Sequence, residues 1–184
     1  MKILFGFLIL CGLSLNAQSH PAGIKVGGNI ANLSGDGTEN VSSMLNFSAG
    51  FFMEIKATKN FKIQPELLFS VYGFKLDEEG SRSNVRLNYV VLPIMAKYFL
   101  SNGVSLDVGP QVGLLVTAKN GTGSLADVKT NFYDRDFGIN AGTSFRISDM
   151  ITLSLRYYFG LNDVTATNVK NYNRAFQLGL QFKI

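Results

Sequence analysis

The sequence lacks several residue types on which common protein classes depend. Its 184 residues include no tryptophan, one cysteine and one histidine, and only 16% are charged, below the roughly 25% of ordinary soluble domains. Hydrophobic residues make up 46%, and Gly (19) far outnumbers Pro (4). This composition excludes a disordered chain, a coiled coil and a small disulfide scaffold. Past the N-terminus there is no apolar run of about 18 residues, so no bundle of membrane-spanning helices is predicted.

The N-terminal segment has the features of a secretory signal peptide. Lys2 supplies a positive start, residues 3–15 are apolar, and Ala17 is a small residue suited to cleavage. We predict a signal peptide at 1–17 and one domain at 18–184; a buried N-terminal helix is the alternative. Because Cys11 lies in this segment, we expect no disulfide, thiolate nucleophile or cysteine metal site in the mature chain.

Charge and histidine content argue against nucleic-acid binding and against catalysis. Without Lys2 the formal net charge falls from +4 to +3, and no Lys/Arg cluster is present, so no nucleic-acid partner is expected. His20 is the only histidine and follows the expected cleavage site closely. Barrel enzymes that act on lipid acyl chains usually need a histidine beside a serine or an acid. We therefore predict a non-enzymatic protein without cofactor or metal.

From residue 23 onward apolar and polar residues alternate with period 2, which predicts β-strands. Turn-rich segments separate eight such runs. We expect strands near 23–32, 45–56, 61–74, 87–99, 103–117, 134–146, 150–161 and 173–184.

The two faces of these strands differ sharply. In the fifth run Leu106, Val108 and Val112 lie on one face, and Asp107 and Thr117 lie on the other. No charged residue falls on the apolar face of seven runs, as expected for a surface in lipid, where Lys or Arg costs roughly 2–4 kcal/mol. The fourth run is apolar on both faces. We predict an all-β fold, an eight-stranded antiparallel up-and-down transmembrane β-barrel. A soluble lipocalin-like barrel with reversed faces is the alternative.

Connection lengths predict the orientation of this barrel. Short connections at 57–60, 100–102 and 147–149 alternate with long ones at about 33–44, 75–86, 118–133 and 162–172. Outer-membrane barrels have short periplasmic turns and longer extracellular loops. We therefore expect both termini on the periplasmic side of the outer membrane of a Gram-negative cell.

Five segments carry a family resemblance across nearly the whole mature chain. They lie at 23–33, 64–70, 89–99, 109–115 and 156–161. In this order they resemble PorT-like outer-membrane β-barrel proteins. The resemblance implies an outer-membrane location, inward positions for Tyr89, Val91, Met95 and Lys97, and an accessory role in protein secretion as one functional variant. It does not imply a single activity.

Charged residues on the inward faces predict a polar network inside the barrel. Its expected members are Lys25, Glu54, Lys62, Glu66, Lys97, Asp107, Asp136, Arg146, Arg156 and Lys183. Charges in a narrow lumen must be paired or hydrated, so we interpret these residues as structural. The alternative is a narrow, weakly anion-preferring channel, although eight strands leave an interior that side chains can fill.

The predicted function is that of a small non-enzymatic barrel, structural or surface-binding through its four long loops. Exposed loops on a rigid scaffold commonly carry binding specificity. The expected partners are outer-membrane lipid and an unidentified extracellular or periplasmic protein. A narrow channel for small solutes and a secretion accessory are the alternatives.

Overall fold

The computed structural model describes residues 20–35, 38, 41–78, 81–121, 126–166 and 170–184. The predicted signal peptide lies outside these residues and stays a prediction. The elements are β1 (Ala22–Gly35), β2 (Val41–Met53), β3 (Ile55–Lys56), β4 (Phe61–Glu78), β5 (Ser81–Phe99), β6 (Val104–Asn120), β7 (Ala126–Asp127), the 3-10 helix η2 (Lys129–Asn131), β8 (Arg135–Arg146), β9 (Ile151–Gly160) and β10 (Asn171–Lys183). In this part of the chain, no helix is long and apolar enough to cross a membrane.

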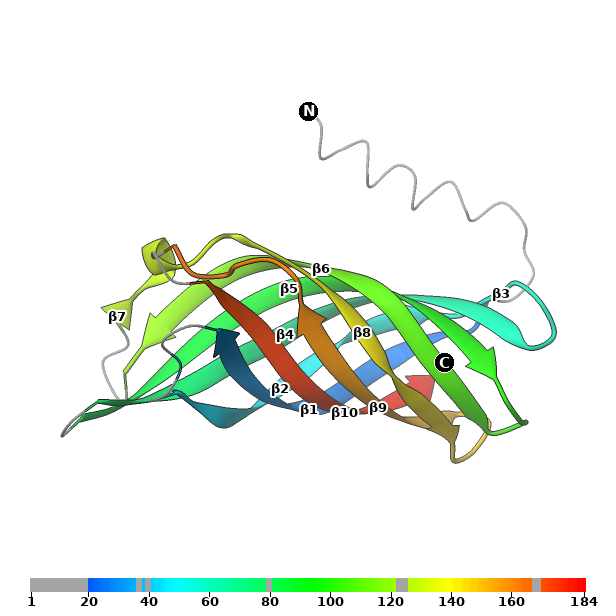
Figure 1. The fold of residues 1–184 in the computed structure, drawn as a ribbon. Coiled ribbons are helices and arrows are strands. Elements are labelled where there is room, and N and C mark those ends of the chain that lie inside the picture. The colour runs from blue at the N-terminus through cyan, green and yellow to red at the C-terminus, as the bar shows by residue number, and fades with distance from the viewer. Residues whose placement is uncertain (1–19, 36–37, 39–40, 79–80, 122–125, 167–169) are drawn as a thin grey trace.

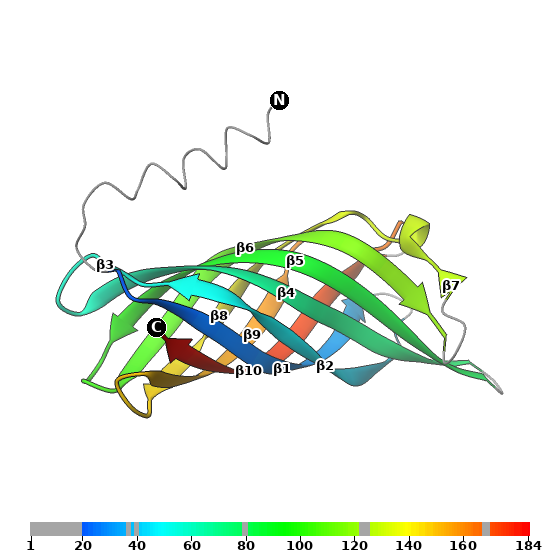
Figure 2. The same cartoon turned by 180° about the vertical axis from the view of Figure 1, so that it is seen from behind.

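The strands form a closed antiparallel barrel (Figures 1 and 2). Each long strand pairs with its neighbour in sequence, β1 pairs with β10, and β2 pairs with β4, with β3 continuing the path of β2. Closure leaves no unpaired edge, which a barrel in lipid requires. The predicted eight-stranded up-and-down fold is confirmed.

We name the two ends of the barrel after the predicted orientation: the end with the chain termini and the short turns is the periplasmic end, and the end with the long connections is the extracellular end. The outer wall is apolar, and the lumen side is polar around the periplasmic half. Phe51 (64% exposed) and Leu114 (58%) project outward, whereas inward residues such as Gln64, Asn140 and Gln181 are fully buried. On β5 the alternation places Tyr89, Val91, Met95 and Lys97 inside, all buried. The predicted facing of the strands is confirmed, including that of the ambiguous fourth run.

One inward prediction is wrong because of a β-bulge. The β5–β6 register runs from Asn88 opposite Thr117 to Tyr89 opposite Leu115, which leaves Val116 unpaired. The extra residue reverses the alternation in β6. Thr117 therefore accepts a hydrogen bond from outward-facing Asn88 (2.6 Å), and Ala118 is buried instead.

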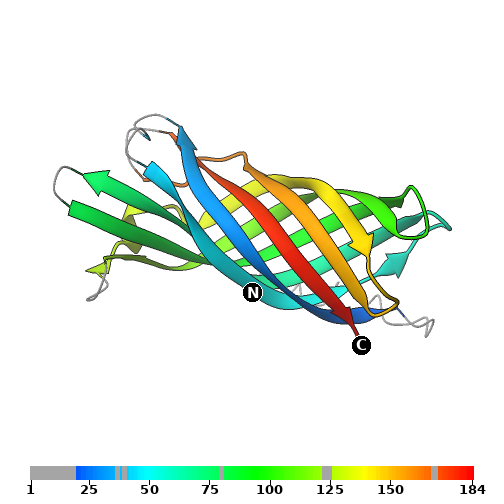
Figure 3. The same ribbon diagram turned by 90° about the horizontal axis from the view of Figure 1, so that it is seen from below.

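The extracellular connections contain more strand than predicted. The expected loop at 75–86 is largely the continuation of β4 and β5, whose register extends to Glu78 opposite Ser81. Backbone pairing satisfies the N–H and C=O groups of this hairpin outside the membrane as well as within it. In Figures 1 and 3 this hairpin reaches beyond the other strands at the extracellular end. The expected loop at 118–133 likewise contains β7 and η2.

Candidate functional site: the filled lumen and its extracellular cap

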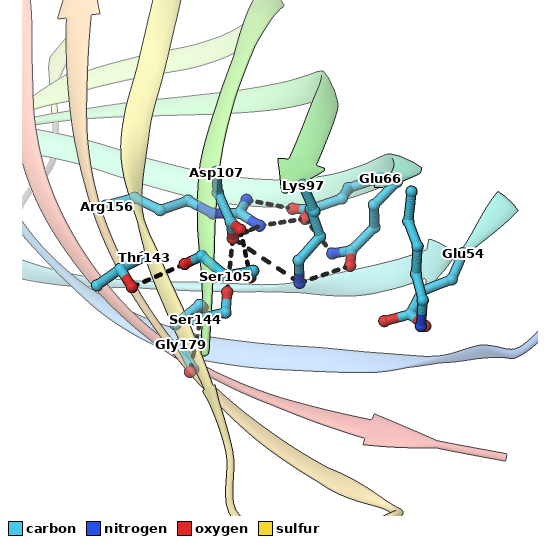
Figure 4. A network of polar contacts seen from close by, with 12 residues as sticks. Glu54, Glu66, Lys97, Ser105, Asp107, Thr143, Ser144, Arg156 and Gly179 are labelled. Atoms are coloured by element: carbon cyan, nitrogen blue, oxygen red, sulfur yellow. Dashed lines mark hydrogen bonds and ion pairs between the residues drawn. The ribbon is translucent and has the colours of Figure 1, made fainter. Parts of the chain in front are cut away.

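A layer of buried charge crosses the lumen at its periplasmic half. Arg156 on β9 reaches Glu66 on β4 with two hydrogen bonds, of 3.0 and 2.8 Å. Lys25 on β1 donates to the same carboxylate (2.9 Å). Figure 4 shows Arg156 and Glu66 extended toward each other. A carboxylate that accepts from both an Arg and a Lys is held by charge-assisted hydrogen bonds from two sides.

Asp107 on β6 is the second carboxylate of this layer. It lies 3.7 Å from the Lys97 Nζ and 3.8 Å from an Arg156 nitrogen. Ser105 and Ser144 donate hydroxyl hydrogen bonds to it (2.7 and 2.5 Å). Gln64 closes the network, because its side chain accepts from Lys97 (3.1 Å) and donates to Glu66 (2.6 Å).

These charged residues come from five strands and are buried inside the lumen. Lys25, Glu66, Lys97, Asp107 and Arg156 are each at most 4% exposed. Three cations face two carboxylates, so the layer carries one excess positive charge. We refer to these five residues as the charged layer.

The remaining predicted network residues lie at other depths. Glu54 accepts from Lys62 (2.6 Å) and lies 3.2 Å from Lys183, at the periplasmic mouth. Arg146 also lies at this mouth but is exposed, with its guanidinium 5.8 Å from the centre of the Phe99 ring. Arg146 keeps the inward face predicted for it but lies at the mouth of the lumen, because it is the last residue of β8 and the barrel ends there.

Asp136 lies toward the extracellular side and is separate from the charged layer. It is fully buried and accepts a hydrogen bond from the Asn173 amide (2.9 Å). Among the described side chains no cation forms an ion pair with it. Asp136 therefore belongs to a polar site next to aromatic residues.

Those aromatic residues form a second layer that the sequence analysis missed. Tyr72 stacks on Tyr158 with ring centres 5.7 Å apart and contacts Tyr89 at 5.5 Å. Gln111 donates to the Tyr72 hydroxyl (2.9 Å). We call Tyr72, Tyr89 and Tyr158 the tyrosine layer. It belongs to one apolar cluster with lumen residues such as Leu87. Its signal in the sequence was the presence of large residues at inward positions, as at Leu115.

Glycine makes room for this layer. A Cβ added at Gly113 would lie 3.3 Å from the Tyr89 ring and 3.4 Å from Val91. The ring therefore packs closely against β6, where a larger side chain would be crowded. Small inward residues are thus part of how a narrow barrel accommodates three tyrosines.

The extracellular mouth is covered by ordered loop segments. Val164 is fully buried, and Val128 and Phe132 pack against the same apolar cluster. Phe132 contacts the ring of Phe74, with centres 6.5 Å apart. The two loops are joined by backbone hydrogen bonds, in which Tyr133 donates to Val164 and Ala166 donates to Asn131 (both 2.9 Å). We call residues 128–133 and 163–166 the cap.

Asp163 holds one end of the cap. Its Oδ1 accepts from the backbone N–H groups of Thr165 and Asn171 and from the Thr165 hydroxyl (each 3.0 Å). Partial burial raises the pKa of the carboxyl, but these hydrogen bonds outweigh it and leave the pKa below the usual value of 3.8. The ionised form is therefore the one that the loop binds.

The described residues of these layers include no histidine and no cysteine. Within the described ranges, no group of three or more His, Cys, Asp or Glu residues could hold a metal ion. His20 is exposed and precedes β1 at the periplasmic end. The contacts of the two layers and the cap link strands across the lumen and fix the outer loops.

The outward apolar wall, the closed strand order and the filled lumen together define a small transmembrane β-barrel of the outer-membrane type. The chain belongs to the family described as outer membrane protein beta-barrel domain, whose match covers residues 16–166. The protein is accordingly an outer-membrane protein. A comparison with curated proteins gave no match.

Solved structures share this fold at low sequence identity. Neisserial surface protein A is 14% identical, with a TM-score of 0.62 over 89% of this chain and 97% of that one. Ail, the attachment invasion locus protein of Yersinia pestis, is 14% identical, with a TM-score of 0.54 over 91% of this chain and 100% of that one. At such identity the similarity establishes the architecture alone.

Proposed function

We propose that this protein is a non-enzymatic barrel that presents a rigid binding surface at the outside of the cell. The observation that carries the proposal is the filled lumen. The charged layer and the tyrosine layer both cross it with buried side chains. Such an interior transmits neither solutes nor substrates, so function must reside on the exterior.

The extracellular end provides the surface. The β4–β5 hairpin extends outward, and the cap is held by Phe132, Val164 and Asp163. An ordered surface loses little conformational entropy on binding. Ail, which has the same fold, has been solved in complex with the heparin analogue sucrose octasulfate, which is a precedent for ligand binding by an eight-stranded barrel.

Single-channel recording in planar bilayers tests the filled lumen. We expect no discrete conductance steps from the folded protein. An established porin, added to the bilayer afterwards, is the positive control. Regular steps from the folded protein would overturn the proposal in favour of a narrow channel.

Photo-crosslinking on intact cells tests the binding surface. A photoreactive residue at exposed Thr130, in the cap, is expected to give a discrete crosslinked species. The matched control is the same residue at exposed Asn102, in a periplasmic turn. Absence of a species at Thr130 and at further exposed cap positions would leave a purely structural barrel and refute surface binding.

Two finer assignments are also part of this proposal. We propose that residues 1–17 are removed on export, so that mass spectrometry of the purified protein finds Gln18 at the N-terminus. A PorT-like role as an accessory of secretion rests on the segment resemblance alone. If deletion of the gene caused no loss of secreted proteins, the accessory role in secretion would be ruled out.

A further inference from the structure

Two cations lie directly opposite each other on the outer wall near the extracellular end. Arg86 on β5 is the cross-strand partner of Lys119 on β6, and both side chains are exposed. Like charges in this position are destabilising. Among the described side chains, no carboxylate forms an ion pair with either residue. The β6–β7 register places Asp127 opposite Lys119 on its other side.

A third cation adds to this patch. Lys75 on β4 lies on the same outward alternation, since Gly73 opposes Arg86 and Lys75 opposes Asn84. The three positive side chains therefore occupy neighbouring strands at one height. An anion bound between them would convert their repulsion into attraction.

On the periplasmic side of the cations the outer wall contains a groove of about 430 Å³. Its apolar part includes Phe47 and Phe69, whose ring centres are 6.2 Å apart, and Val71, which is only 5% exposed despite its outward position. The groove forms where the β2–β4 pairing is interrupted between Ser43 and Ser48. Arg86, Asn88 and Lys119 line its upper part.

The depth of the groove matches the outer leaflet. On β5 the outward positions from Tyr98 to Val90 carry apolar side chains, and about nine to eleven tilted residues span a bilayer. Arg86 follows just beyond this stretch on the extracellular side. The cations therefore lie at the height of headgroups, and the aromatic groove lies at the height of acyl chains.

We propose that this groove binds a phosphorylated, acylated glycolipid of the outer leaflet. A phosphate lies between Arg86 and Lys119, where the guanidinium donates paired hydrogen bonds and the ammonium adds a point charge. An acyl chain packs on Phe47 and Phe69. Asn88 and Thr117, which are hydrogen-bonded to each other (2.6 Å), provide polar groups beside the sugar.

Native mass spectrometry with defined lipids tests the proposal. The probe is bis-phosphorylated lipid A, compared with its dephosphorylated form and with phosphatidylethanolamine. The folded wild type is expected to retain lipid A preferentially. Arg86→Gln combined with Lys119→Gln is expected to weaken retention about tenfold or more, as loss of two charge-assisted contacts implies. Lys56→Gln combined with Lys59→Gln is the matched control, because it removes the same charge from the periplasmic end.

Thermal unfolding supplies a second readout, because the loss of one cation is expected to have opposite effects on stability without and with lipid A. In lipid-free detergent, Lys119→Gln is expected to raise the unfolding temperature, because it removes the like-charge pair. With lipid A present, the same variant is expected to gain less stability than the wild type. Equal retention by both double variants, or equal binding of dephosphorylated lipid A or phosphatidylethanolamine, would overturn the phosphate site.

Discussion

Arg156 and Glu66 join opposite walls of the barrel through two hydrogen bonds in the charged layer (2.8 and 3.0 Å). The two residues are not equivalent in the layer. Glu66 binds both Arg156 and Lys25, so its removal would leave three cations with one carboxylate. Removal of Arg156 would leave two cations with two carboxylates.

Replacing Glu66 is therefore expected to destabilise the barrel more than replacing Arg156. Glu66→Leu leaves three buried cations with one carboxylate, and loss of one partner from a buried pair costs about 3–5 kcal/mol. Arg156→Leu leaves a balanced set and loses charge-assisted hydrogen bonds of about 1.5–3 kcal/mol. Urea unfolding in lipid vesicles measures both. Unchanged stability of Arg156→Leu, or the reverse order, would contradict a required network.

Packing of the tyrosine layer on glycine gives a second prediction. Gly113→Val places a side chain against the Tyr89 ring, 3.3 Å from the new Cβ, and overpacking costs about 1–3 kcal/mol. In a double-mutant cycle with Tyr89→Ala, the two losses are expected to be less than additive, because the valine fills space that the ring vacates. Gly28→Ala is the control, since its Cβ meets nothing closer than 3.9 Å. Strict additivity would show that the two positions do not share this space.

The cap gives a third prediction, which limited proteolysis on intact cells can check. Phe132 anchors the cap to the apolar cluster, so Phe132→Ser is expected to raise the rate of tryptic cleavage after Lys129 about tenfold or more through local opening. Tyr133→Ser is the matched control, because this neighbouring ring is exposed. Equal cleavage rates for the two variants would mean that Phe132 does not hold the loop.

The cap is also expected to loosen in acid. The lowered pKa of Asp163 means that its hydrogen bonds contribute fully above the usual value of 3.8. The contribution is lost as the pH falls from that value through the lower pKa of the folded loop. Amide exchange at Thr165 and Asn171 is therefore expected to gain protection across this range as the pH rises, relative to Ile151 at the start of β9. Asp163→Asn should abolish that difference, and a persistent pH response in this variant would assign it to another group.

Much of the architecture follows from the two-residue period. The alternation of Leu106, Val108 and Val112 with Ser105 and Asp107 identifies a strand with one face in lipid, and it does so without knowledge of its neighbours. Facing is a local property of each strand. This is why the inward position of Asp107 could be predicted from its own strand. The fourth run is apolar on both faces, so the inward positions of Tyr89 and Lys97 were expected from the family resemblance instead.

Other features depend on how strands are placed relative to one another. The bulge at Val116 depends on the register between β5 and β6, and the alternation in β6 alone could not indicate it. The partnership of Arg156 with Glu66 spans strands that are not neighbours, so facing alone does not select it. The depth of Arg146 could not be predicted either. Alternation indicated its inward face but not its position at the barrel mouth.

The cap was beyond prediction for a further reason. Its segments at 128–133 and 163–166 are short and irregular. Phe132 is partly buried and Val164 is fully buried only because each loop covers the barrel mouth. Polar, glycine-containing connections gave no indication of this mutual packing. The tyrosine layer beneath was hidden similarly, since Tyr72 and Tyr158 come from separate strands.

The pairing of the first and last strands also determines when the barrel can form. β1 finds its second neighbour only in β10, and the amide of Ile184 donates to the carbonyl of Ala22 (2.9 Å) at the end of that seam. Contacts between distant parts of a chain form slowly, since loop closure precedes them. The seam therefore cannot close until the whole polypeptide has crossed the inner membrane. Until then two exposed strand edges remain open to aggregation.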